Sequence, residues 1–142
     1  MRIFAHENRL GRIALFLIYG WFGMLKALGL SPASSLVLAL LHEITPWMNQ
    51  NAFVFWFGLF EVLIGTAFLV VGARRWVVRV FFLHIVMTMA PLVVLPQETW
   101  STWFVPTLAG QYIIKNLALI ALVRFMVKVE KMGTHPSHKN SP

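Results

Sequence analysis

Residues 53–71 read FVFWFGLFEVLIGTAFLVV, and after the turn GARR at 72–75 a second apolar run follows at 76–95, WVVRVFFLHIVMTMAPLVVL. Each run matches the ~20 residues that an α-helix needs to cross the hydrocarbon of a bilayer. The basic turn between the two runs is typical of a connection kept on the cytoplasmic side. The stretch therefore predicts two consecutive transmembrane helices. Pro91 predicts a kink in the second of them, because proline leaves a carbonyl of the preceding turn without its helical partner.

Two further apolar runs flank this pair, at residues 13–30 and 107–127. We therefore predict an all-α, polytopic membrane protein whose residues 1–130 form a single domain, a four-helix transmembrane bundle. Residues 131–142 are polar and predict a disordered cytoplasmic tail.

The connections on the other side of the predicted bundle carry the remaining features. Ser31-Pro32 is a helix start signal, and the segment that follows it to Ile44 is too short to span a bilayer. It predicts a short interfacial helix between the first two spans. Residues 96–106 predict an outer loop, in which Trp100 and Trp103 suit the level of the lipid head groups.

Charge supports this topology. The chain of 142 residues is 58% hydrophobic and only 12% charged, with a formal net charge of +7, whereas soluble domains carry about a quarter charged residues. Ten basic residues precede the first run, lie at the second turn or follow the last run: Arg2, Arg9, Arg12, Arg74, Arg75, Arg79, Arg124, Lys128, Lys131 and Lys139. Basic residues stay on the cytoplasmic face of a membrane, so both chain ends are predicted to be cytoplasmic. The predicted partner of this basic chain is the lipid bilayer and not nucleic acid.

The sequence contains no cysteine, which excludes disulfides and thiolate-ligated metal centres. His135 and His138 in the tail have no third ligand nearby, so no metal site is predicted.

Four ionisable residues fall within the predicted spans: Lys26, Glu61, His84 and Lys115. Such residues are costly in lipid and usually face the bundle interior with a partner. Glu61 and Lys115 are each about 12 Å below the outer ends of their spans, and Lys26 about 6 Å below, by helical rise. Equal depth predicts an ion pair between Glu61 and Lys115, with Lys26 close enough to compete for the carboxylate.

Neighbouring residues extend this cluster into a predicted ligand pocket that opens outward. Gly58 and Gly65 share a stripe with Glu61 and would let another helix approach closely. The predicted pocket residues are Lys26, Glu61, Lys115, Tyr112, Gln111 and His84. Two interpretations stay open: a structural salt bridge, or a site for a small anionic or quinone-like ligand. His84 is either a proton relay or quinone hydrogen-bond donor, or a histidine satisfied by a neighbouring hydroxyl or freed carbonyl.

These motifs occur in the order Gly23-x-x-Lys26, Gly58-x-x-Glu61-x-x-x-Gly65, Pro91-Leu92-Val93 and Gly110-x-x-x-x-Lys115-Asn116. In this order the chain, from about Leu10 to Phe125, resembles the DoxX-like superfamily, in particular its small bacterial inner-membrane branch of unknown function. The resemblance implies a four-helix transmembrane bundle in a bacterial inner membrane, with Lys26, Glu61 and Lys115 as pocket residues.

The resemblance also implies a function. We expect an accessory or quinone-interacting subunit of a redox or stress-protection system, with a quinone as candidate cofactor and a membrane-associated oxidoreductase as candidate partner. Catalytic residues are not identified, and direct thiol chemistry is disfavoured because cysteine is absent. The alternatives are a small-molecule or proton transporter and a non-catalytic membrane chaperone or scaffold. Assembly as a homo-oligomer also stays open.

Overall fold

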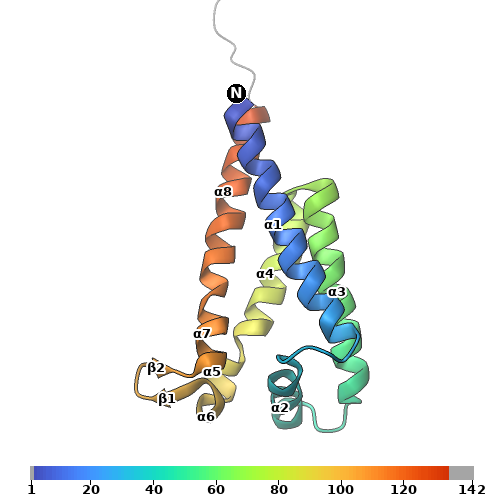
Figure 1. Ribbon diagram of the computed structural model, residues 1–142, viewed down its shortest axis with the longest axis vertical. Helices are drawn as coiled ribbons and strands as arrows, with labels where there is room; N and C mark the ends of the chain where they lie inside the picture. The colour runs from blue at the N-terminus through green and yellow to red at the C-terminus, as the bar shows by residue number, and fades with distance from the viewer. Residues whose placement is uncertain (1, 135–142) are drawn as a thin grey trace, which may run out of the picture.

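The computed structural model describes the backbone of residues 2–134 and the side chains of residues 8–132. Most of this part of the chain is helical, which confirms the all-α class. The elements in chain order are α1 (Arg2–Ala27), α2 (Ser34–Ile44), α3 (Gln50–Val71), α4 (Arg75–Met89), α5 (Pro91–Val94), α6 (Pro96–Thr99), β1 (Trp100–Thr102), β2 (Val105–Pro106), α7 (Leu108–Ile114) and α8 (Asn116–Thr134) (Figure 1).

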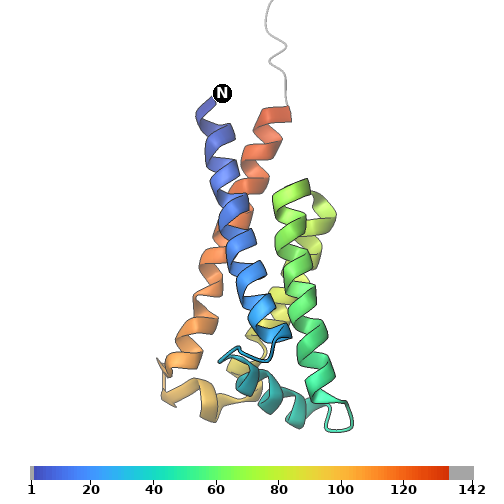
Figure 2. The same ribbon diagram turned by 45° about the vertical axis from the view of Figure 1, so that its right-hand side comes forward.

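Helices α1 and α3, α4 with α5, and α7 with α8 run between the two ends of the molecule (Figures 1 and 2). Three stretches of described helix are long and apolar enough to cross a membrane: Asn8–Ala27, Gln50–Val71 and Arg75–Val94. The predicted span at 107–127 is instead divided at Lys115, between α7 and α8. The chain thus has the composition and helix lengths of a membrane protein.

Pro91 breaks the third span as expected. Because proline has no N–H to donate, the carbonyl of Met87 cannot make its usual helical hydrogen bond to residue 91. It accepts instead from the N–H of Ala90 at 3.3 Å, and α5 begins at Pro91. The break lets the chain turn toward α6 at the end of the molecule opposite the N-terminus (Figure 1).

The hydrophobic core lies where α1, α3, α4 and α8 meet. Its fully buried side chains include Leu15, Phe68, Phe81, Val123 and Met126. Outside this core, large apolar side chains are exposed on the same helices, including Trp21, Trp56, Leu63, Val70 and Val86, each 66–72% exposed. An apolar outer surface around a packed interior is what helices in lipid require.

Helix α1 packs closely along α3, and glycines make this approach possible. A Cβ atom added at Gly23 would lie 2.5 Å from the carbonyl oxygen of Gly58, and one at Gly58 would lie 2.5 Å from the carbonyl oxygen of Gly23. A Cβ at Gly65 would lie 3.0 Å from the Cβ of Tyr19. The prediction that Gly58 and Gly65 let another helix approach is confirmed, and that helix is α1.

Glu130 of α8 connects α8 to α1 and to the turn between α3 and α4. Its Oε1 accepts hydrogen bonds from Arg12 Nη2 at 2.9 Å, from the backbone N–H of Ala73 at 3.0 Å and from Asn8 Nδ2 at 3.2 Å. Gly72 has φ +82°, and a side chain there would collide with the guanidinium of Arg12. This contact holds the start of α1, the α3–α4 turn and the end of α8 together at one end of the molecule (Figure 1).

The opposite end contains α2, α6 and a two-stranded antiparallel hairpin of β1 and β2 (Figure 2). Sequence analysis predicted an outer loop at 96–106 and did not foresee the hairpin. Trp103 and Phe104 at its turn are 88% and 78% exposed, and Phe104 has φ +58°.

Two predicted boundaries also differ. Ser31 does not cap a helix at Pro32; its hydroxyl accepts from the N–H of Ala33 at 3.2 Å, and α2 begins only at Ser34. The predicted tail was placed at 131–142, but α8 continues through Thr134 because its hydrogen-bonded turns run on without a break. Residues 135–142, including His135 and His138, lie outside the described part of the chain.

Candidate functional site

Lys26 and Glu61 form a two-pronged ion pair inside the molecule. Lys26 Nζ lies 2.5 Å from Glu61 Oε1 and 2.6 Å from Oε2. The two residues are only 8% and 4% exposed. A buried lysine and a buried carboxylate that share two hydrogen bonds cancel each other's charge, which makes their burial tolerable.

The geometry of the two helices directs these side chains toward each other. In an α-helix the Cα–Cβ bond tilts toward the N-terminus. Helices α1 and α3 run in opposite directions (Figure 1). Lys26, in the last turn of α1, therefore leans toward the middle of the molecule, and Glu61 leans toward the end at which α3 begins. Both residues lie one turn from the glycines Gly23 and Gly58, where the two backbones are closest.

His84 of α4 connects this pair to Tyr19 of α1. His84 Nε2 lies 3.0 Å from Glu61 Oε1, and His84 Nδ1 lies 3.3 Å from the hydroxyl of Tyr19. Tyr19 and His84 are 4% and 3% exposed. With a neutral imidazole, the Tyr19 O–H donates to Nδ1 and the Nε2–H donates to the carboxylate, so every polar atom along the row has a partner. We call Tyr19, His84, Glu61 and Lys26 the polar row.

Aromatic rings enclose the polar row. The ring of Phe57 stacks on His84 at 5.0 Å between centroids, and Lys26 Nζ lies 5.5 Å from the Phe57 centroid. The ring of Phe60 lies 6.0 Å from His84. These rings keep water from the charges and strengthen the electrostatic interactions among them. The side chains of the polar row are thus joined by a continuous series of hydrogen bonds in apolar surroundings.

The predicted ion pair between Glu61 and Lys115 is wrong, because Lys26 and His84 occupy the carboxylate. Lys115 is exposed, and its Nζ lies over the ring of Tyr112, 4.7 Å from the centroid. Equal depth did not bring the two residues together because α3 packs against α1 and α4, whereas α7 packs against α4 and α8.

The predicted pocket set is therefore divided. The structure brings Lys26, Glu61 and His84 together, but Gln111, Tyr112 and Lys115 lie on an exposed surface of the α7–α8 segment. Of the two interpretations of His84, the hydroxyl partner is present in Tyr19, and the contact with Glu61 leaves the proton relay open.

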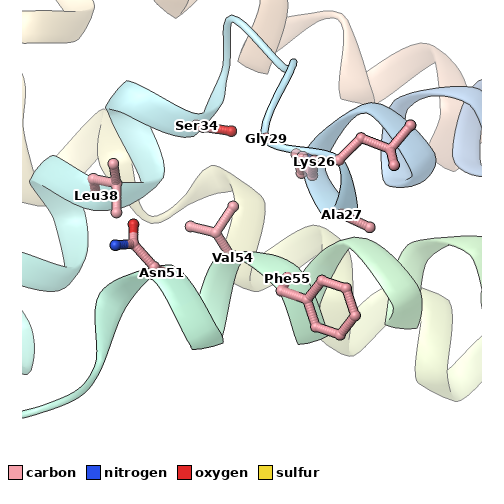
Figure 3. Close-up of a pocket in the computed structure, with 9 residues that line it drawn as sticks. Lys26, Ala27, Gly29, Ser34, Leu38, Asn51, Val54 and Phe55 are labelled. Atoms are coloured by element: carbon pink, nitrogen blue, oxygen red, sulfur yellow. The ribbon is translucent and has the colours of Figure 1, made fainter.

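A pocket of about 390 Å³ lies beside Lys26, at the end of the molecule that contains α2. Its walls come from the end of α1, the start of α2 and the start of α3, with Leu38, Val54 and Phe55 as apolar lining (Figure 3). The hydroxyl of Ser34 points toward the turn that follows α1 (Figure 3). The Ser34 Oγ atom is buried and has no hydrogen-bond partner. An unpaired buried hydroxyl costs about 1–3 kcal/mol, so this atom favours a ligand that completes its hydrogen bonding.

Sequence reasoning missed Tyr19, Phe57 and Ser34 as site residues. Tyr19 lies seven residues before Lys26 on the same helical stripe, and this spacing was the available signal. No comparable signal marked Ser34, because its place depends on how α2 folds back against α3. Among the described residues there is no group of three histidine, aspartate or glutamate side chains placed to hold a metal ion.

Comparisons with known proteins add no assignment: no protein family, curated protein or solved structure matches this chain. The chemistry of the site must therefore be argued from its own residues.

Proposed function

We propose that this chain is a DoxX-like integral membrane protein that acts as a quinone-interacting accessory subunit of a redox or stress-protection system. In this proposal it spans a bacterial inner membrane as a four-helix bundle, with both ends in the cytoplasm. The α7–α8 column is the fourth span, and α2 lies along the outer interface. The basic residues at one end of the molecule and the apolar exposed helices support this orientation.

One observation carries the ligand site: Lys26 of the polar row and Ser34, whose buried hydroxyl has no hydrogen-bond partner, both line this pocket. Lys26 has three N–H groups, and Glu61 takes two of them. In this proposal the third N–H of Lys26 and, after a rotation of its side chain, the unpaired hydroxyl of Ser34 donate to an occupant of the pocket.

A quinone head group fits these features. It is a flat apolar ring whose carbonyl oxygens accept hydrogen bonds, and the pocket combines apolar walls with two donors. A volume of about 390 Å³ lies within the range of small-molecule sites. When bound, a quinone would serve as an acceptor of electrons and protons. The chain's own contribution is to orient the ring through Lys26 and Ser34 and to hold exchangeable protons along Glu61, His84 and Tyr19.

Binding of a short-chain quinone such as decylubiquinone to the purified chain in mild detergent tests the proposal. Ser34→Ala removes one donor and is expected to weaken binding by roughly 2–12-fold, the equivalent of one neutral hydrogen bond. Ser35→Ala is the matched control, because this neighbouring serine is exposed and its hydroxyl donates to the carbonyl of Pro32. Leu38→Trp, which fills the pocket, is expected to abolish binding. Equal binding by all three variants would reject the pocket as the site.

A second candidate, proton transport, is favoured by the continuous hydrogen-bonded row itself. It predicts proton flux into proteoliposomes that hold a pH-sensitive dye, and loss of that flux in Tyr19→Phe. Flux without quinone binding would replace the first candidate by the second. Copurification of a membrane oxidoreductase would favour the first.

A further inference from the structure

A second hollow, separate from the polar row, lies between α4 and α8 toward the basic end of the molecule. Its volume is about 620 Å³. The α4 side is apolar, with Val78 and Phe82, and Phe125 of α8 adds a second aromatic ring. Val127 and three cationic residues of α8 complete the lining; the cations are Arg124, Lys128 and Lys131. We call this hollow the basic groove.

No acidic residue lines the basic groove, and two of its cations, Arg124 and Lys128, form no ion pair among the described residues. The nearest acidic residue along α8, Glu130, directs its carboxylate to Arg12 and to the backbone of Ala73. The groove therefore presents a net positive charge next to apolar side chains.

With the α3–α4 turn placed at the membrane surface, the basic groove lies at the depth of the boundary between lipid head groups and acyl chains. Glu130 lies level with the α3–α4 turn, because its carboxylate contacts the N–H of Ala73. Arg124 lies six residues earlier in α8, about 9 Å further toward the middle of the bundle by helical rise. The head-group region of one leaflet is roughly 5–8 Å thick. The cationic and aromatic side chains of the basic groove therefore lie at the level where head groups meet acyl chains.

We propose that the basic groove binds an anionic phospholipid of the leaflet at the basic end. The phosphate of the lipid contacts Arg124 and Lys128, and an acyl chain lies against Phe82 and Phe125. Charge complementarity selects an anionic lipid over a zwitterionic one, and basic pockets between transmembrane helices bind such head groups. This inference does not depend on the quinone site and would hold if that site failed.

The experiment is native mass spectrometry of the full chain in mild detergent with equal amounts of dioleoyl phosphatidylglycerol and dioleoyl phosphatidylcholine at low salt. We expect the wild type to retain phosphatidylglycerol in preference. The double variant Arg124→Gln/Lys128→Gln should bind it about 30-fold more weakly, or about five-fold per basic residue removed. The matched control Arg74→Gln/Arg79→Gln removes the same charge from exposed positions of the same end that do not line the groove. It should change binding by less than about three-fold.

Each other outcome overturns the proposal. Equal retention of both lipids by the wild type removes the basis for an anionic site, and equal losses in both double variants would indicate diffuse surface charge. Displacement of the lipid by inorganic phosphate at low concentration would indicate a free-anion site. A lipid-free dimer that disappears in the Arg124→Gln/Lys128→Gln variant would assign the groove to a second copy of the chain.

If that variant fails to fold, Lys128→Gln alone, at an exposed position, should bind phosphatidylglycerol about five-fold more weakly than the wild type.

Discussion

Removing Lys26 is the sharpest test of the polar row, because the structure reverses its expected role. Depth alone made Lys26 a surplus cation beside a Glu61–Lys115 pair, whereas the structure makes it the ion partner of Glu61 at 2.5 and 2.6 Å. Lys26→Met keeps the length of the side chain and removes its charge. It leaves the Glu61 carboxylate, in a residue only 4% exposed, with His84 as its remaining partner.

Breaking one side of a buried ion pair typically costs about 3–5 kcal/mol. For a chain of this size, 1 kcal/mol corresponds to roughly 3–5 °C in melting temperature. Lys26→Met is therefore expected to lower the melting temperature in detergent by roughly 10 °C or more. Glu61→Gln should lower the melting temperature by less. Lys26 lines the pocket beside it, so its freed ammonium can turn toward the mouth of that pocket.

Thermal unfolding followed by tryptophan fluorescence in mild detergent measures these effects. The double variant Lys26→Met/Glu61→Gln removes both charges while the amide oxygen still accepts from His84, so it should recover most of the loss. Lys115→Met is the matched control and should melt close to wild type, because Lys115 is exposed, lies over the ring of Tyr112 and forms no ion pair among the described residues. A Lys26→Met protein that melts within about 2 °C of wild type would refute the ion pair, since one broken buried pair should exceed that shift. So would a Lys115→Met loss of equal size.

Three further outcomes follow from the same structure. Gly58→Ala would place a methyl group 2.5 Å from a backbone carbonyl oxygen of α1 and should prevent accumulation of the folded protein, whereas Gly20→Ala meets only an aromatic side chain at 3.6 Å and should be neutral or stabilising by melting temperature. Tyr19→Phe removes the hydroxyl that reaches His84 and should cost about 1 kcal/mol in the same melt, and no change would show that the contact is not made. In the cysteine-free chain, a single cysteine at the exposed position Thr102 should react with an impermeant maleimide from outside intact cells, and one at the exposed position Arg75 only after permeabilisation; the reverse pattern would contradict the topology.

Much of the fold could be predicted from the sequence, because the length of an apolar run and the placement of charges are local properties of the chain. The runs that contain Leu63 and Val86 are long and apolar enough to predict spans, and both side chains are exposed on the outside of the described helices. Pro91 predicted its break because the missing N–H acts within one helical turn. The hairpin at Trp103 was missed because two short strands depend on each other and not on a hydrophobic period.

Sequence alone also determined that Lys26, Glu61 and His84 require internal partners, because each lies in an apolar run where an unpaired ionisable group is costly. It could not determine which partners they have. Helical rise yields the depth of a residue but says nothing about which helix is its neighbour, and the packing of α1 on α3 through Gly23 and Gly58 decides that. That packing, with side chains leaning in opposite directions on antiparallel helices, joins Glu61 to Lys26 and leaves Lys115 on the surface.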